Sequence, residues 1–564
     1  MASPDTTAHP RLELYDTTLR DGTQGLGVNL SVRDKLQIAE LLDDLGFDFI
    51  EGGYPLSNPK DAEFFDTAVE RPRKHGRLCA FGMTRRKNIA ADDDTGMNAL
   101  LAAKTPVVTL VGKTWDLHVD QVLGVSQEEN LAMIRESAQV LSSADHVEML
   151  VYDAEHFFDG YAANPAYALS TLRAAVKGGA QRLVLCDTNG GSLPQQVHQA
   201  VTDVRRELGL GGSLDEGGAL VGIHCHNDAG LAVANSLAAV DAGAVHVQGT
   251  INGIGERCGN VDLIPIAANA ALKLGFDVLR PGALEKLTDL SQRVYELAQL
   301  PPQTGQPYVG AGAFAHKGGM HVHAVQKTPM AYEHVAPEAV GNKRRVLVSE
   351  LSGVSNVAAT LGERYGIADD RQLQRRVLER VQDLEHAGYQ FERAEASFEL
   401  LLHDARGSRT RFWELDHYRC SILKRDGGAM PPTEAVVKLQ IDGRTRHEVA
   451  EGDGPVDALA AALRRCVAPA FPVIDQVHLT DYQVRVINPS AETAAKVRVT
   501  AAFALRPQGE GEPELAFTTI GVHENIVEAS WEAISDAFQY CLLRTSAEPS
   551  SDRRRGESAT PATV

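Results

Sequence analysis

The sequence predicts an α/β protein with a (β/α)8 barrel, followed by helical linker subdomains and a C-terminal α+β domain. Three observations support this fold class. Short apolar segments typical of buried strands recur at fairly regular intervals up to about residue 252. Segments with helical periodicity separate them, and several end on glycine, as helix C-termini often do. Eight strand–helix pairs within about 250 residues is the size of a (β/α)8 barrel.

The eight expected strands are short, and helical segments lie between them. In chain order they span residues 12–19, 47–53, 78–83, 107–112, 147–153, 182–188, 220–227 and 245–251. The expected helices include "SVRDKLQIAELLDDLG" and "NPAYALSTLRAAVKGG". An open doubly wound sheet is the alternative arrangement, but no GxGxxG motif follows the first strand. We therefore favour the barrel.

The remaining chain divides into further parts. With the barrel domain at 1–295, we expect linker subdomains at 296–405 that contribute to the active site, a regulatory domain at 406–545 and a disordered tail at 546–564. The Gly- and His-rich stretch "YVGAGAFAHKGGMHVHAV" in the linker is typical of irregular, functional loops. Helical patterning returns over 350–405.

The expected regulatory domain has a pattern of its own. From about residue 410, strands such as "TEAVVKLQI", "YQVRVINP" and "AKVRVTAAFALR" alternate with helices such as "GPVDALAAALRRCV" and "IVEASWEAISDAFQYCLLR". This alternation predicts an α+β domain with a core of its own. It contains no evident catalytic set of residues, which favours a site for an effector.

Composition and charge narrow the functions that the chain could have. Of its 564 residues, 43% are hydrophobic and 23% are charged, which is ordinary for a soluble globular protein. The formal net charge of −20 argues against a nucleic-acid partner and against an anionic membrane surface. Seven cysteines without a CxxC pair argue against a disulfide framework and a thiolate zinc site. The N-terminal residues lack the apolar core of a signal peptide, so we expect a cytoplasmic protein.

The motif "HCHND" at 224–228 places two histidines at alternate positions of an expected strand. Side chains at i and i+2 of a strand point to the same face, so His224 and His226 should converge. In a barrel of this kind the chemistry lies at the C-terminal ends of the strands. An HxH motif alone is more often structural than metal-binding, so its meaning depends on what the other strand ends contribute.

Polar side chains follow several other expected strands. Arg20 and Asp21 come after the first strand, Glu155 comes near the end of the fifth, and Thr188 comes at the end of the sixth. Asn260 lies in the Gly-rich loop "GTINGIGERCGN" after the eighth strand. One carboxylate, two imidazoles and a carboxamide at one mouth suit Zn²⁺, Mn²⁺ or Mg²⁺ with open positions for a substrate. Each motif considered alone also has a structural explanation, since "RDG" could be a simple turn and the Gly-rich loop could be a simple connection.

The segments "LYDTTLRDGTQG", "HCHND" and "GTINGIGERCGN" resemble the signature motifs of metallolyases that combine a TIM barrel with a D-R-E catalytic set. Within that superfamily the chain resembles the α-isopropylmalate, homocitrate and citramalate synthases over almost its whole length, including "GAFAHKGGMHVHAV" and "YEHVAPEAVGNKRR". "EGGYPLSNPKDAEFF" and "YDAEHFFDGYAANPAYAL" are most similar to the citramalate synthase branch. "RDGTQG" departs from the RDG-E-Q pattern usual in isopropylmalate synthases, which also favours that branch.

The resemblance implies which residues hold the metal ion and the keto acid. Arg20 would oppose the charge of the substrate carboxylate and of the oxyanion that forms when the ketone is attacked. Thr188 would hydrogen-bond the same carboxylate. Both are therefore expected to bind substrate, and Arg20 is also expected to be catalytic. The implied ligands of a divalent Mn, Mg or Zn ion are Asp21, His224, His226 and Asn260.

The resemblance also implies which residues act on acetyl-CoA. Its methyl group must lose a proton, and that step requires a base. The resemblance implies that Glu155 acts in this proton transfer together with His321 and Tyr332. The last two would come from the partner subunit of a homodimer. His323 would share a face with His321 if that stretch were extended. The implied acetyl-CoA loop comprises Gly253, Gly255, Glu256 and Gly259.

The implied reaction is the condensation of acetyl-CoA with pyruvate, followed by thioester hydrolysis, in isoleucine biosynthesis. Isoleucine would be the feedback effector, bound near helices at 451–463 and 523–538 whose preceding turns offer backbone N–H groups. The nearest alternative is a synthase for a bulkier keto acid, such as a 2-isopropylmalate or homocitrate synthase. A lyase of the hydroxymethylglutaryl-CoA type would not need the C-terminal domain, and a non-catalytic metabolite-binding protein would not need the intact metal set.

Overall fold

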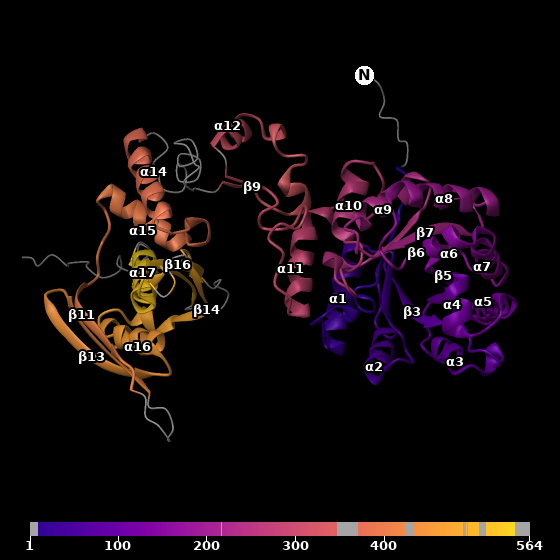
Figure 1. Ribbon diagram of the computed structural model, residues 1–564, viewed down its shortest axis with the longest axis horizontal. Helices are drawn as coiled ribbons and strands as arrows, with labels where there is room; N and C mark the ends of the chain where they lie inside the picture. The colour runs from indigo at the N-terminus through magenta and orange to yellow at the C-terminus, as the bar shows by residue number, and fades with distance from the viewer. Residues whose placement is uncertain are drawn as a thin grey trace, which may run out of the picture. The chain divides into compact units, whose positions relative to one another are not determined.

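The computed structural model describes residues 9–215, 217–317, 319–346, 370–423, 432–488, 492, 494–506 and 515–546. The chain divides into two compact units (Figure 1). The first comprises Met1–Phe314 and Glu333–Arg344, and the second comprises Ala315–Tyr332 and Arg345–Val564. None of the helices in the described part of the chain is long and apolar enough to cross a membrane.

The first unit contains a closed barrel of eight parallel strands, as the sequence predicts. Each strand pairs with the next, and β8 pairs with β1 to close the barrel. All eight expected strands are confirmed, with boundaries that differ by a few residues. Their bounds are β1 (Glu13–Asp16), β2 (Phe49–Gly53), β3 (Arg77–Met83), β4 (Val107–Lys113), β5 (Met149–Glu155), β6 (Arg182–Asp187), β7 (Leu220–Cys225) and β8 (His246–Gly249).

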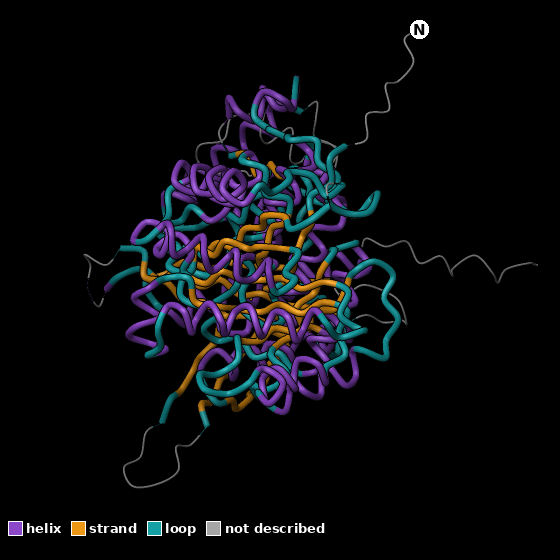
Figure 2. The backbone as a smooth tube through the Cα atoms, turned by 90° about the vertical axis from the view of Figure 1, so that its right-hand side faces the viewer, coloured by secondary structure: helices purple, strands orange, loops and turns teal. Residues whose placement is uncertain are grey.

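Helices cover the strands, and Figure 2 shows them in purple over the orange strands. Helix α1 begins after Ser31, which forms a capping box with Asp34, and ends at Gly46, whose left-handed φ of 86° suits glycine. Helices α5 and α7 likewise begin after the capping residues Ser126 and Asn164, and α8 ends at the left-handed Gly209. The helices are α1 (Val32–Leu45), α2 (Pro59–Ala68), α3 (Thr95–Ala102), α4 (Asp116–His118), α5 (Gln127–Ser142), α6 (Phe157–Ala163), α7 (Pro165–Lys177), α8 (Pro194–Leu208), α9 (Ala232–Asp241), α10 (Leu263–Leu272) and α11 (Leu287–Ala298).

A buried ionic network lies where the strands begin. Glu13, at the start of β1, accepts two hydrogen bonds of 2.8 Å from the Arg182 guanidinium at the start of β6. Nδ1 of His246, at the start of β8, lies 3.0 Å from the same carboxylate. Burial alone would raise the pKa of Glu13, but these partners lower it to about 2. The network therefore ties three strands together at the N-terminal end of the barrel.

The second unit begins with a short helical region. Helix α12 (Gly319–Lys327) follows β9 (Ala315–His316), which pairs with β10 (Arg345–Val346). The sequence-based expectation of irregular loops is therefore wrong for α12, where the backbone forms regular helical hydrogen bonds. His321 therefore lies on a helix and not on an extended stretch, and the side chain of His323 lies outside the described part of the chain.

The C-terminal part of this unit has two three-stranded antiparallel sheets, which confirms the expected α+β class. One sheet has the order β11-β12-β13 and the other β14-β15-β16, and α16 and α17 pack in the core beside them. The strands are β11 (Glu414–Ser421), β12 (Thr433–Ile441), β13 (Arg444–Gly452), β14 (Val477–Val486), β15 (Val497–Leu505) and β16 (Leu515–His523). The helices are α16 (Pro455–Val467) and α17 (Ile526–Ser546), which begin a few residues later than expected.

Helices α14 (Arg371–His386) and α15 (Glu395–Arg406) belong to this same unit. Leu373 of α14 and Leu402 of α15 share a hydrophobic cluster with Ile520 and Val522 of β16. The helices of the expected linker therefore pack on the expected regulatory domain. The rest of the predicted helical region, residues 347–369, and the predicted tail beyond residue 546 lie outside the described residues.

Candidate active site

The turn after β1 positions Arg20 and Asp21. The strand ends at Asp16, three residues earlier than predicted, because the Asp16 carboxylate turns the chain. It accepts hydrogen bonds from the backbone N–H and the hydroxyl of Thr18, at 2.9 and 2.8 Å. Asp21 then has helical backbone angles and begins a short 3-10 turn. This turn brings both Arg20 and Asp21 to the mouth of the barrel.

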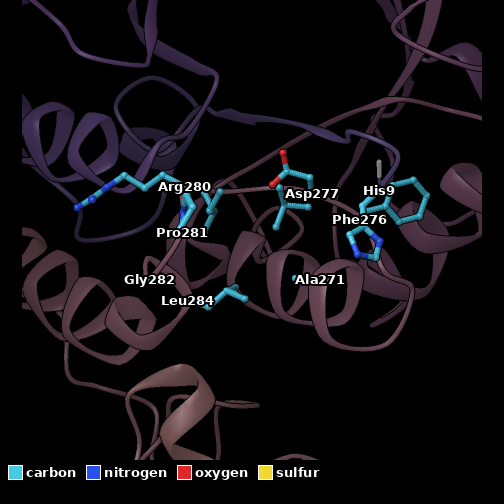
Figure 3. Close-up of a pocket in the computed structure, with 10 residues that line it drawn as sticks. His9, Ala271, Phe276, Asp277, Arg280, Pro281, Gly282 and Leu284 are labelled. Carbon is cyan, nitrogen blue, oxygen red and sulfur yellow. The ribbon is translucent and has the colours of Figure 1, made fainter. Parts of the chain in front are cut away.

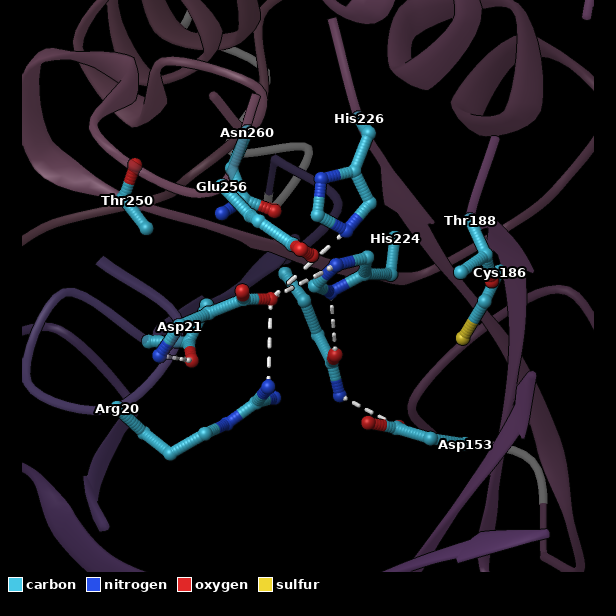
Figure 4. A network of polar contacts seen from close by, with 12 residues as sticks. Arg20, Asp21, Asp153, Cys186, Thr188, His224, His226, Thr250, Glu256 and Asn260 are labelled. Carbon is cyan, nitrogen blue, oxygen red and sulfur yellow. Dashed lines mark hydrogen bonds and ion pairs between the residues drawn. The ribbon is translucent and has the colours of Figure 1, made fainter. Parts of the chain in front are cut away.

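Asp21, His224 and His226 form a buried group that could hold a metal ion (Figure 4). One potential ligand atom from each lies within 4.8 Å of the others. Nε2 of His224 is 3.3 Å from Oδ2 of Asp21, and Nε2 of His226 is 3.9 Å from the same oxygen. Strand β7 ends at Cys225, and His226 instead forms an isolated antiparallel bridge with Asn260. The predicted convergence of the two imidazoles is confirmed.

The Gly-rich loop brings Asn260 to this group. Gly253 and Gly259 have left-handed φ angles of 65° and 86°, which L side chains rarely adopt. A side chain at Gly259 would collide with the carbonyl oxygen of Gly253, and one at Gly255 would collide with the Asn260 carboxamide. The loop can therefore fold back on itself only with glycine at these positions. Oδ1 of Asn260 is buried without a hydrogen-bond partner among the described residues.

This donor set fits a divalent cation. It offers a carboxylate, two imidazoles and a buried carboxamide oxygen without a partner, which are ligands of Mn²⁺, Mg²⁺ and Zn²⁺. Burial alone would raise the pKa of Asp21, but Arg20 and His224 hold it well below its ordinary value. Burial, with a smaller effect from His224, lowers the pKa of His226 to about 4. An ionised Asp21 and a neutral His226 are the forms that bind a metal ion.

Residues behind His224 orient its imidazole, and the sequence analysis missed them. Nδ1 of His224 lies 3.0 Å from Oε1 of Gln248, and Nε2 of Gln248 donates to Asp153 at 2.9 Å (Figure 4). Burial raises the pKa of Asp153 to about 7, and the neighbouring Glu51 charge adds to this effect. The available signal was a polar residue within each apolar strand segment, since Asp153 ends "VEMLVYD" and Gln248 lies inside "VHVQGTI".

Arg20 is held by Glu51 of β2, a third residue that the sequence did not single out. Nε of Arg20 donates a hydrogen bond of 2.6 Å to Glu51. The Arg20 guanidinium carbon also lies 3.9 Å from the centre of the Phe81 ring. Glu51 also accepts hydrogen bonds from the hydroxyls of Tyr15 and Thr17, at 2.6 and 2.5 Å. Nη1 of Arg20 then lies 3.3 Å from Asp21. Glu51 therefore fixes the guanidinium plane beside the candidate metal group.

Glu155 and Thr188 lie at neighbouring strand ends. Glu155 is the last residue of β5, and its carboxylate forms an ion pair with Lys113, the last residue of β4. Thr188 directly follows β6, and its hydroxyl oxygen accepts a hydrogen bond of 2.8 Å from the backbone N–H of His156. That bond leaves the hydroxyl proton of Thr188 available to donate to an anion.

The remaining candidate residues lie in the Gly-rich loop after β8 and in the second unit. In the loop, Gly253 and Gly259 donate their N–H groups to carbonyls of the same loop, and Glu256 pairs with the neighbouring Arg257. His321 and Tyr332 belong to the second unit, where their rings stack with centroids 4.3 Å apart.

A pocket of about 470 Å³ lies at the other end of the barrel (Figure 3). Asp277 in its wall pairs with Arg11, just before β1, and Arg280 contacts the end of α1, just before β2. These contacts place the pocket where strands begin, away from Asp21 and the histidines. The pocket is therefore separate from the candidate metal group at the C-terminal mouth of the barrel.

Comparisons with known proteins agree with this fold. Residues 11–294 match the HMGL-like family, residues 308–388 match the homocitrate synthase post-HMGL domain-like family, and residues 392–542 match the LeuA allosteric (dimerisation) domain. The chain therefore belongs to the HMGL-like family, whose barrel here carries a LeuA allosteric domain.

Relatives that align over nearly the full chain show to which branch of the family this protein belongs. The chain is 49% identical to an (R)-citramalate synthase of Synechocystis sp., with 95% of this chain and 97% of that protein covered. It is 46% identical to an (R)-citramalate synthase of Aquifex aeolicus, with 95% and 99% covered. A 2-isopropylmalate synthase of Methanocaldococcus jannaschii is 30% identical, with 95% of each chain covered. Within the family, this chain belongs with the (R)-citramalate synthases.

Proposed function

We propose that this protein condenses acetyl-CoA with pyruvate and, with water, forms (R)-citramalate and CoA. The observation that supports this most directly is the group Asp21, His224 and His226 at the barrel mouth of a chain that is 43–49% identical to five (R)-citramalate synthases. The condensation needs a site that binds a 2-keto acid and opposes the charge formed on its ketone oxygen. The residues at the mouth suit both tasks.

Asp21, His224, His226 and Asn260 would hold a divalent Mn, Mg or Zn ion. When bound, the ion supplies a Lewis acid that orients the keto acid and polarises its ketone. Gln248 accepts a hydrogen bond from Nδ1 of His224 and so directs Nε2 toward the ion. The unpartnered Oδ1 of Asn260 would gain the partner that a buried carboxamide oxygen needs.

Arg20 would neutralise the pyruvate carboxylate and the developing oxyanion. Burial alone would lower the pKa of Arg20, but Glu51 and Asp21 raise it above its ordinary value, so it stays charged. Because Nε is occupied by Glu51, the Nη groups are the ones left for the substrate. Thr188 would donate its hydroxyl proton to the same carboxylate, since its oxygen already accepts from His156.

Glu155, with His321 and Tyr332, would move the protons of the reaction. The methyl group of acetyl-CoA loses a proton to a base, its carbon bonds to the ketone carbon of pyruvate, and the ketone oxygen takes a proton to become a hydroxyl. Water then adds to the thioester, and the C–S bond breaks to release CoA. Lys113 orients the Glu155 carboxylate through an ion pair. His321 and Tyr332 would come from the partner subunit, and the loop with Gly253, Gly255, Glu256 and Gly259 would lie along acetyl-CoA.

The LeuA allosteric domain supports regulation and dimerisation of this enzyme. We propose a homodimer in which isoleucine, the end product of the implied route, binds the C-terminal domain and lowers turnover. Such coupling requires that isoleucine bind one conformational state better than another.

The decisive experiment measures CoA release from acetyl-CoA with pyruvate, 2-ketoisovalerate or 2-ketoglutarate, in the presence of added Mn²⁺ or Mg²⁺. We expect kcat/KM for pyruvate to exceed that for the larger acids by about tenfold or more, because a small pocket excludes extra methyl groups. NMR of the product should show citramalate. A preference for 2-ketoisovalerate would instead assign a 2-isopropylmalate synthase, and cleavage of hydroxymethylglutaryl-CoA would assign a lyase.

A further inference from the structure

The second unit contains a pocket of about 410 Å³ between α14, α15 and α17. Its wall includes three arginines, two aspartates and several apolar side chains. The three helices lie beside one another in this unit (Figure 1), and α14 and α15 share their hydrophobic cluster with β16. Nothing in the proposed reaction uses this pocket.

The two aspartates of the pocket are already satisfied by Arg409. Nη1 of Arg409 lies 2.6 Å from Asp404, and Nη2 lies 3.0 Å from Asp536. Asp536 also accepts a hydrogen bond of 3.1 Å from Ser397. Burial raises the pKa of Asp536, although Arg409 opposes this effect. These carboxylates therefore have little remaining capacity to bind a cationic ligand.

The remaining hydrogen-bond donors in the wall are cationic. Arg376 and Arg380 are one turn apart on α14, and both are exposed at the pocket without an ion pair to any described residue. Nε of Arg409 is buried and has no hydrogen-bond partner in the described part of the chain. A buried donor without a partner costs free energy unless water or a ligand satisfies it. The exposed guanidinium groups of Arg376 and Arg380 therefore make this part of the wall suited to an anion.

The opposite part of the wall is apolar. Leu384, Phe391 and Leu401 line it, and Phe391 is held by ring contacts with Tyr389 and Phe398. A ligand that fits both parts has one anionic group and a short hydrocarbon body. We propose that this pocket is an accessory binding site for a small carboxylate anion with an apolar tail, which Arg376 and Arg380 hold by its charge. This inference does not depend on the proposed reaction.

The test uses hexanoate as the probe and isothermal titration calorimetry on the full chain. We expect one saturable site, with acetate and 1-hexanol binding at least about tenfold more weakly, since each lacks one half of the recognised chemistry. The double variant R376Q/R380Q should weaken hexanoate binding about tenfold or more, because two charge-assisted contacts are lost.

The matched control is R371Q/R375Q. It removes the same charge from the same helix at exposed positions that do not line the pocket, and it should bind hexanoate like the parent protein. Circular dichroism and the unfolding temperature of both variants should match the parent, so that loss of folding is not mistaken for loss of binding. Absence of hexanoate binding would overturn the proposal. Equal weakening in both double variants, or inorganic phosphate binding as tightly as hexanoate, would also overturn it.

Discussion

Nδ1 of His224 lies 3.0 Å from Oε1 of Gln248, and this contact determines which nitrogen of the imidazole faces Asp21. The amide oxygen can only accept, so Nδ1 carries a proton, and in the neutral imidazole Nε2 then presents its lone pair. Gln248 in turn donates to Asp153. The orientation of a candidate metal ligand is thus set by residues on two other strands of the barrel.

Gln248→Leu should weaken Mn²⁺ binding by roughly 10- to 100-fold, the usual effect of removing a partner that orients a metal-bound histidine. Calorimetric titration of the metal-stripped protein with Mn²⁺ measures this directly. Gln199→Leu, at an exposed position of α8, is the control and should bind Mn²⁺ normally. Unchanged affinity in Gln248→Leu would show that the contact does not position His224.

His226→Ala should abolish turnover and lower the bound metal, because a buried ligand is lost from the group. His198→Ala removes an exposed histidine from α8 and should change neither. Chelator treatment of the parent protein should remove activity, and added Mn²⁺ or Mg²⁺ should restore it. Full activity in a protein shown by elemental analysis to be metal-free would contradict a catalytic role for the ion.

Arg20→Lys should lower kcat by roughly 10²-fold, the scale of losing one donor to a developing oxyanion. Lysine keeps the charge but cannot donate to Glu51 and the substrate in one plane. Steady-state kinetics with pyruvate give the value, and Arg206→Lys on the exposed face of α8 is the control. A kcat near that of the parent would mean that Arg20 does not contact the reacting atoms.

Glu13→Gln should destabilise the barrel at neutral pH and much less in acid. The pKa of Glu13 is lowered from 4.5 to about 2, so its contribution is complete above the unfolded value and is lost as the pH falls toward 2. The shift corresponds to about 3 kcal/mol. Urea unfolding at pH 7 and pH 3 should therefore show a smaller difference between parent and variant at pH 3. A difference that does not depend on pH would contradict the role of the Glu13 charge.

Removal of the C-terminal region should abolish inhibition by isoleucine. A chain that ends near residue 405, at the predicted domain boundary, would keep α15 but remove its packing partners Ile520 and Val522. A chain that ends at residue 346 removes α14 and α15 as well and is therefore the better test. The chain that ends at residue 346 should keep the barrel and its metal binding. Sedimentation measures whether it still forms a dimer. If it remains active and is still inhibited by isoleucine, the effector binds elsewhere.

Much of the architecture follows from local patterns. Each barrel strand is a short apolar segment, and α1 lies within the expected helical segment "SVRDKLQIAELLDDLG", which ends on Gly46, so neighbouring residues alone specify these elements. Asp21 and His224 were also predictable, because parallel strands in a barrel end at one mouth whatever their distance along the chain. Asn260 was a candidate from its place in the Gly-rich loop after the eighth strand, and the resemblance then implied that it is a metal ligand.

The sequence by itself determined the barrel, its order of strands and the ligand types at its mouth, since these depend on local periodicity and on one topological rule. Only the tertiary structure decided that Glu51 holds Arg20, that Gln248 orients His224 and that Gly255 makes room for Asn260. It also decided that α15 packs against β16. The physical reason is that these contacts join residues far apart in the chain. Many inward-facing side chains look alike in the sequence, and only closure of the barrel and packing of the helices determine which of them meet.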